Sequence, residues 1–135
     1  MILELQNIDP QRVAAIDSNG DQLVYADITL LSQQICANIP ERSLCFLLVE
    51  NNIGGIAWTM SMLESHKLVP LILNVKTEDS LYQQLLDTYK PSYICAPTHV
   101  TLDGEIVDSQ FGYQLCKVSD NLCMLHPELS HLLPT

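Results

Sequence analysis

The sequence predicts an α/β fold in which a mainly parallel sheet is flanked by helices. Two continuous apolar runs of strand length, 44–49 and 68–73, enclose a segment whose apolar residues recur with helical spacing. Runs that are apolar throughout are typical of parallel strands covered by helices on both faces, whereas half-exposed strands alternate. We therefore expect a strand–helix–strand crossover, and such crossovers are almost always right-handed.

The helix inside this unit is expected to bury the apolar side chains that recur at intervals of three and four residues. These side chains are Ile53, Ile56, Ala57, Met60 and Leu63. Trp58 lies beside the same stripe. Its large apolar ring is expected to be buried, either against the sheet or against a neighbouring subdomain.

The N-terminal region predicts a β-hairpin followed by an amphipathic helix. Two short strand-like pieces, 13–17 and 22–25, are joined by a turn that contains an Asn-Gly pair, the pair best suited to a tight hairpin. From Asp27 to about Asn38, apolar residues again recur with helical spacing. Asp27 suits the positive end of the helix dipole.

The region after the central unit predicts another helix and a third buried strand. Thr77 is expected to cap the helix at its N-terminus, and Lys90-Pro91 is expected to end it. The expected buried face consists of Leu81, Leu85 and Tyr89. The apolar run 92–96 then follows as a short buried strand, so strands and helices alternate as in a parallel α/β sheet.

The C-terminal third predicts antiparallel strands at the end of the sheet. An Asp103-Gly104 turn is expected to join strands at 100–102 and 105–107, and 113–118 alternates like a half-exposed strand. The segment 127–135 resembles the start of a further strand. We interpret its abrupt end as a cut within a longer protein, so that residues 1–135 form a single α/β domain or subdomain.

The composition argues against several partners. Sixteen acidic and six basic residues give a formal net charge of −10. This charge disfavours nucleic acid and anionic membranes, because both attract clustered Lys and Arg. No run approaches the length of a membrane span, and the N-terminus lacks the features of a signal peptide, so a cytoplasmic protein is expected.

Two further features of the composition concern the core and the surface. Charged residues make up 16% of the chain, below the roughly 25% of a typical domain. Either an absent partner covers apolar surface, or the composition simply varies, and both explanations remain open. The cysteines include no C-x-x-C pair and are expected to be reduced core residues. They are Cys36, Cys45, Cys95, Cys116 and Cys123.

Few residues are arranged for chemistry. The sequence contains no P-loop, dinucleotide, nucleophile-elbow or zinc-protease motif. Gly54-Gly55 opens the central helix, where close packing is preferred over phosphate binding. Glu50-Asn51-Asn52 follows the first central strand at the edge where α/β folds bind ligands, and a polar helix start is the preferred interpretation. Surface or capping roles are preferred for His66, His99, His126 and His131.

Together these segments resemble the N-terminal part of the adenylate-forming superfamily, which includes acyl-CoA synthetases, acyl-protein synthetases and the adenylation domains of peptide synthetases. The hairpin and the helix start Tyr25-Ala26-Asp27-Ile28 are similar to that family's opening. Residues 44–74 are similar to its strand, Asn-led helix and Val-Pro-Leu strand, here Val69-Pro70-Leu71. Thr77 to Ile94 follows the family's next helix and its Lys-Pro-x-x-Ile strand.

The end of the chain extends the resemblance. Residues 129–135 are similar to the strand that leads into the family's Thr-Ser-Gly-x-Thr-Gly-x-Pro-Lys phosphate loop, of which Thr135 would be the first residue. The sequence departs from the family where Asp27-Ile28 replaces Glu-Leu and where Ser65-His66 replaces an Ala-Gly pair.

The resemblance implies a parent ligase that uses ATP and Mg²⁺ to convert a carboxylate into an acyl-adenylate and then passes the acyl group to a thiol or an amine. The groups that stabilise the phosphates would lie after Thr135, so this chain alone is expected to carry no catalytic residue, metal or cofactor. Its expected partners are the remainder of the ligase and further copies of itself. The alternative is a stand-alone, non-catalytic α/β interaction module.

Overall fold

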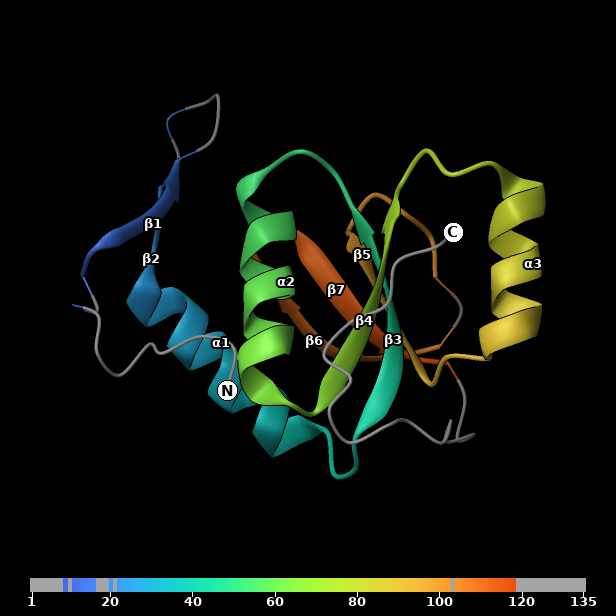
Figure 1. Cartoon of the computed structure of the whole chain (residues 1–135), viewed down its shortest axis with the longest axis horizontal. Helices are drawn as coiled ribbons and strands as arrows, with labels where there is room; N and C mark the ends of the chain where they lie inside the picture. The colour runs from blue at the N-terminus through green and yellow to red at the C-terminus, as the bar shows by residue number, and fades with distance from the viewer. Residues whose placement is uncertain (1–8, 10, 17–19, 21, 103, 119–135) are drawn as a thin grey trace.

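The computed structural model describes residues 9, 11–16, 20, 22–102 and 104–118. Three helices and seven strands lie within these residues (Figure 1). In chain order they are β1 Val13–Ile16, β2 Gln22–Val24, α1 Tyr25–Asn38, β3 Ser43–Val49, α2 Ile53–Ser65, β4 Leu68–Asn74, α3 Asp79–Tyr89, β5 Tyr93–Pro97, β6 Glu105–Gln110 and β7 Tyr113–Lys117. The α/β class predicted from the sequence is confirmed. The segment 127–135, with Thr135, His126 and His131, lies outside the described residues.

The main sheet is mixed rather than mainly parallel. Its strand order is β4-β3-β5-β7-β6. β3 is parallel to both β4 and β5, whereas β7 is antiparallel to β5 and to β6. β6 and β7 form a hairpin in which β7 pairs antiparallel with β5 and β6 occupies the outer edge, running in the same direction as β5.

The two crossovers run in opposite directions across the sheet. From β3 the chain passes through α2 to β4, and from β4 it returns through α3 to β5 on the far side of β3. Right-handed crossovers in opposite directions place their helices on opposite faces. Accordingly, α1 and α2 pack on the face that carries Cys45 and Leu47, while α3 packs on the face that carries Phe46 (Figure 1).

β4 is an edge strand of the described sheet, where β3 is its neighbour. Pro70 lies in the middle of β4, opposite Cys45. Proline has no N–H to donate, so it is tolerated on an edge strand and not in the centre of a sheet. Pro70 is therefore consistent with the position of β4 at the edge of the sheet.

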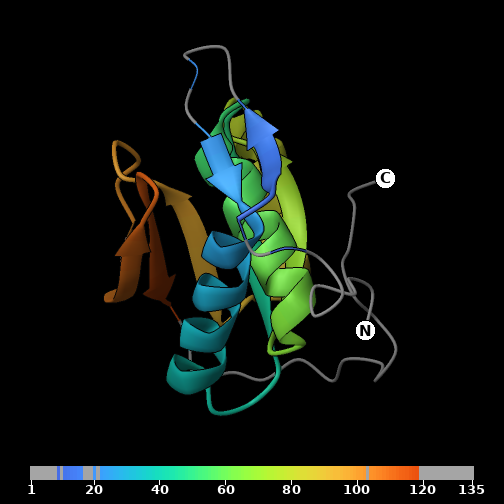
Figure 2. The same ribbon diagram turned by 90° about the vertical axis from the view of Figure 1, so that its left-hand side faces the viewer.

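The N-terminal hairpin and the first helix form largely as expected. β1 and β2 pair antiparallel, and the hairpin lies against α2 (Figure 2). α1 begins at Tyr25, so the second strand ends one residue earlier than expected. The Asp27 carboxylate accepts a hydrogen bond from the Val24 N–H at 3.1 Å, which satisfies one of the free donors at the helix start.

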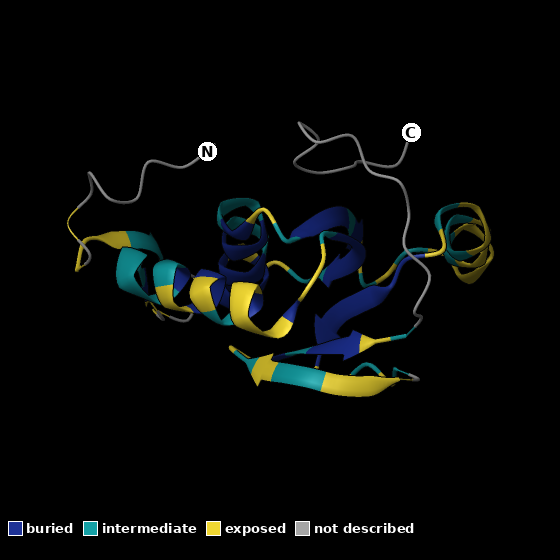
Figure 3. Cartoon of the chain, turned by 90° about the horizontal axis from the view of Figure 1, so that it is seen from below, coloured by how far each residue is buried: buried dark blue, intermediate teal, exposed yellow. Residues whose placement is uncertain are grey.

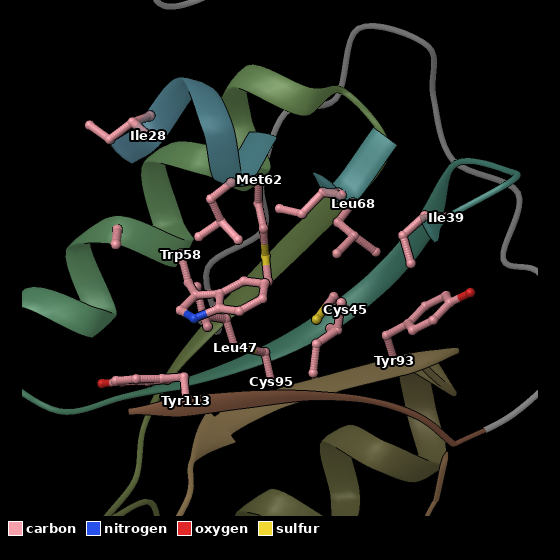
Figure 4. Close-up of a cluster of buried hydrophobic side chains, with 14 of the residues drawn as sticks. Ile28, Ile39, Cys45, Leu47, Trp58, Met62, Leu68, Tyr93, Cys95 and Tyr113 are labelled. Carbon is pink, nitrogen blue, oxygen red and sulfur yellow. The ribbon is translucent and has the colours of Figure 1, made fainter. Parts of the chain in front are cut away.

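The buried face of α2 differs from the expected one. Trp58 is fully buried and points toward the sheet near Leu47 and Cys95 (Figure 4). Ile56 is 39% exposed, and Met60 and Leu63 are only half-buried, so the prediction for these three residues is wrong. α2 is apolar around most of its circumference, and periodicity alone therefore does not fix which side faces the sheet.

α3 is attached to the sheet less completely than the other helices. It begins at Asp79 with Glu78 as N-cap, not Thr77, whose hydroxyl instead donates to the Asn74 carbonyl at 2.6 Å. None of its residues is fully buried, and Leu81 is exposed, contrary to expectation (Figure 3). Its apolar side packs half-buried against the sheet through Tyr82, Leu85, Leu86 and Tyr89.

A second hairpin exists, but it is not the expected one. β6 and β7 are joined by Phe111-Gly112, and residues 100–102 are not a strand, so the prediction of a hairpin between 100–102 and 105–107 is wrong. Phe111 and Gly112 have φ angles of 56° and 75°. Two consecutive positive φ angles fit a type I′ turn, whose twist matches that of the strands. Phenylalanine is a poor residue for such a position, which explains why the sequence gives no signal there.

Three of the four described cysteines belong to the core. Cys45, Cys95 and Cys116 are buried, as expected, whereas Cys36 is exposed, so the core prediction is wrong for that residue. Cys123 lies outside the described residues. Burial raises the pKa of the Cys45, Cys95 and Cys116 thiols, because a thiolate loses its hydration inside the protein.

None of the helices in the described part of the chain has the length and apolar character needed to cross a membrane.

The thiols should differ sharply in reactivity, because the thiolate is the reactive form. In a Cys123→Ser variant treated with a chromogenic disulfide reagent at mildly alkaline pH, we expect Cys36 to react rapidly in the native state. The other three thiols should react only after unfolding. Rapid native labelling of Cys45 or Cys95, identified by peptide mapping, would contradict the packing described above.

His66 ends α2 in the left-handed conformation, with a φ of 57°. Because an L side chain is strained there, His66→Gly should raise the free energy of unfolding by about 0.5–1 kcal/mol. Gln33→Gly is a matched control at an exposed interior position of α1, where glycine should cost about 1 kcal/mol. Chemical denaturation measures both, and equal destabilisation by the two variants would refute the strain at position 66.

Candidate functional site

The carboxyl ends of the three parallel strands meet at one edge of the sheet. β3 ends at Val49, β4 at Asn74 and β5 at Pro97. From β3 the chain continues to a helix on one face, whereas β5 is reached from a helix on the other face. The boundary between β3 and β5 is therefore the topological switch point, where open α/β sheets bind ligands.

A hydrogen bond between two side chains bridges this switch point. His99, in the segment that follows β5, lies with Nε2 2.7 Å from the Glu50 Oε1 atom at the end of β3. The side chains are 65% and 36% exposed, respectively. An exposed pair of this kind contributes little to stability. It does hold the segment after β5 against the end of β3.

Tyr113 ties the same edge together from the antiparallel side. Its hydroxyl accepts a hydrogen bond from the Glu50 N–H at 2.9 Å and donates to the Asn52 Oδ1 atom at 2.8 Å. The same Asn52 oxygen accepts from the Gly55 N–H at 3.1 Å, which makes Asn52 the N-cap of α2. Burial raises the pKa of Tyr113, so the hydroxyl remains protonated and can donate.

The two glycines of α2 serve packing, as expected. A Cβ atom on Gly54 would lie 2.4 Å from the Phe111 carbonyl oxygen and 2.5 Å from the Tyr113 ring. A Cβ atom on Gly55 would lie 2.9 Å from the Glu50 carbonyl oxygen. The β6–β7 turn and Tyr113 thus lie where an incoming phosphate would have to approach, which argues against a phosphate cradle.

Two pockets flank the end of β3, one on each face of the sheet. The α2 pocket has a volume of about 220 Å³. Its walls include Val49, Glu50, Asn51, Ile56, Thr59 and Met60. The α3 pocket has a volume of about 160 Å³ and lies between the start of α3 and residues 100–102. Successive residues of β3 point to opposite faces, so Leu48 lines the α3 pocket and Val49 the α2 pocket.

The chemistry available at this edge centres on the His99–Glu50 pair. A histidine paired with a carboxylate can act as a general base. Among the described residues, the His99 side chain forms a hydrogen bond with Glu50. No described Ser, Thr or Cys side chain is hydrogen-bonded to His99 as a nucleophile would be. Within the described residues, no group of three or more His, Cys, Asp and Glu side chains is placed to hold a metal ion.

The sequence identified part of this edge and missed part. Glu50, Asn51 and Asn52 do lie at the carboxyl edge, and Asn52 is a helix cap, as preferred from the sequence. Tyr113 was not anticipated as their partner. It lies 63 residues from Glu50 in the chain, and only its place in an alternating strand indicated an inward side chain. His66 lies at the opposite end of α2, remote from this edge.

No protein-family model matches the chain, and no curated protein matches it.

Replacing Tyr113 by phenylalanine should destabilise the protein by about 0.5–1.5 kcal/mol, because the ring still packs while the part-buried Glu50 N–H loses its acceptor. Tyr82→Phe is the matched control, since the Tyr82 hydroxyl makes no recorded hydrogen bond to another described residue and should change stability little. Equal effects of the two substitutions would show that the Tyr113 hydroxyl does not tie the edge together.

The pH dependence gives a second measurement on the same variants. The raised pKa of Tyr113 means that the unfolded chain ionises first, at about pH 10. The contribution of Tyr113 is therefore complete below that pH and is lost as the pH rises above it. Between about pH 9 and 11 the stability of Tyr113→Phe should fall less steeply than that of the unaltered chain.

Proposed function

We propose that this chain forms an N-terminal scaffold of the large domain of an adenylate-forming ligase of the acyl-CoA or acyl-protein synthetase type. The observation that carries the proposal is the order of the elements, taken together with the positions of the residues that resemble the family. Within the described residues, the segments named in the resemblance coincide with elements or with junctions between elements.

The coincidence holds along most of the described chain. The hairpin leads into a helix that starts at Tyr25, and Asn52 caps the helix between the first two parallel strands. Val69-Pro70-Leu71 lies within the edge strand β4, and Lys90-Pro91 separates α3 from β5. These features extend from Tyr25 to Pro91. An unrelated sequence would match all of them in the same order less often than it would match any one of them.

Position 66 gives separate support. The resemblance implies a glycine there, where this chain has His66. The backbone at that position is left-handed, a conformation that favours glycine at the end of a helix. His66 therefore differs from the family's glycine in its side chain, while its left-handed backbone conformation is one that glycine adopts more easily.

The proposal assigns the chemistry to the remainder of the parent ligase. ATP and Mg²⁺ would be bound by groups outside the described residues, with Thr135 as the first residue of the phosphate loop. The described part contributes the parallel strands and the helices on both faces. Its exposed apolar side chains would contact the remainder of the ligase or further copies of the chain. These side chains include Ile16, Leu30, Leu81, Ile106 and Phe111.

The first test is the gene that encodes the chain. A continuation after Thr135 that encodes Ser-Gly-x-Thr-Gly-x-Pro-Lys is the expected result. A stop codon directly after Thr135 would instead favour the stand-alone interaction module.

The second test is enzymatic. The 135-residue chain should catalyse no carboxylate-dependent exchange of pyrophosphate into ATP, because the groups that stabilise charge on the phosphates are absent from it. The longer protein, assayed with a panel of carboxylic acids, should catalyse the exchange with at least one of them. Exchange by the purified 135-residue chain would overturn the proposal, as would an inactive long protein that binds no ATP.

A further inference from the structure

The α2 pocket combines an apolar wall with a polar end. Ile56 and Met60 of α2 and Val49 of β3 form the apolar wall. Glu50 and Asn51 lie at the polar end, beside the switch point. A volume of about 220 Å³ is below the roughly 300–1,000 Å³ of sites for drug-sized ligands, so the pocket suits a short-chain molecule.

The polar end of the pocket offers hydrogen-bond acceptors on Glu50 and Thr59 beside the side-chain amides of Asn51 and Asn52. The Glu50 carboxylate uses Oε1 for His99 and has further lone pairs available on Oε2. The Thr59 hydroxyl donates its hydrogen to the Gly55 carbonyl at 2.7 Å, which leaves its oxygen as an acceptor. The Gly55 N–H, a donor that an anion could use, is already bonded to Asn52. A ligand group that donates hydrogen bonds therefore finds acceptors on both Glu50 and Thr59.

The charges at the pocket favour a cation. Glu50 is the only charged residue among those that line it. The start of α2 contributes about half a positive charge, which is smaller than the full negative charge of the carboxylate and is distributed over several N–H groups. The formal charge of −10 on the whole chain adds a field that attracts cations and repels anions.

We propose that the α2 pocket binds a short aliphatic primary ammonium compound. Its hydrocarbon chain lies against Val49, Ile56 and Met60, and its ammonium group donates to the Glu50 carboxylate and the Thr59 hydroxyl. The proposal is independent of the ligase assignment, since it uses only residues at the end of β3 and the start of α2.

The test is an NMR titration of the full chain, with amide and methyl signals followed near neutral pH. The probes are n-butylammonium, n-butanol and butyrate, which share a four-carbon chain and differ in the polar group. Saturable shifts centred on Ile56, Thr59 and Met60 are expected for butylammonium. Its affinity should exceed that of butanol about tenfold, the usual effect of one charge-assisted hydrogen bond, and butyrate should bind more weakly than both.

Two variants separate the polar and apolar contributions. Glu50→Gln should remove most of the preference for butylammonium over butanol, and Glu41→Gln, an exposed carboxylate elsewhere, should leave it unchanged. Ile56→Ser should weaken butylammonium and butanol alike. Because Ile56 and Glu50 are partly exposed, both variants should fold, which the dispersion of the amide signals verifies.

Three results would each overturn the proposal. They are the absence of saturable shifts at the pocket with butylammonium, binding of butyrate as tight as that of butylammonium, and an unchanged amine preference in a folded Glu50→Gln variant. None of these results depends on whether the parent protein forms adenylates.

Discussion

The burial of β3 on both faces and along both edges is the constraint on which the rest of the structure depends. Residues Leu44 to Leu48 are all buried, and parallel strands pair with β3 on each side. Parallel neighbours require crossover connections, and a central strand with one neighbour on each side requires crossovers in opposite directions. The helices on both faces and the switch point at the end of β3 follow from this arrangement.

The contact between Tyr113 and the start of α2 fixes the structure of the sheet edge at which β3 ends. A phenol hydroxyl bonded to Glu50 and Asn52 fixes the antiparallel part of the sheet to the crossover unit. The absence of a Cβ atom on Gly54 allows the turn before β7 to approach the helix. The start of α2, which in other α/β proteins receives phosphates, is here covered by protein. This favours a scaffold or binding role for the described residues over phosphate chemistry.

The orientation of α2 about its own axis decides which apolar side chains are buried and which line the α2 pocket. Trp58 and the glycines occupy the side that faces the sheet, so Ile56 and Met60 are displaced outward and form one wall of a pocket. The same residues would have filled the core if the helix had been oriented as its periodicity suggests. α3, which buries no residue completely, leaves a second incompletely covered region on the other face. Both features fit a domain that contacts a further protein segment or a small ligand.

The sequence by itself determined the elements and the class of the fold, because strand runs, helical spacing and turn residues are local. It predicted the two central strands, the hairpin of β1 and β2, and a polar helix start at residues 50–52. Only the tertiary structure decided the orientation of α2, the partnership of Tyr113 with Glu50, the turn at Phe111-Gly112 and the pairing of His99 across the switch point. The contacts of Tyr113 and His99 with Glu50 join residues 63 and 49 positions apart, and the orientation of α2 and the turn before β7 depend on how these surfaces pack once the sheet has formed.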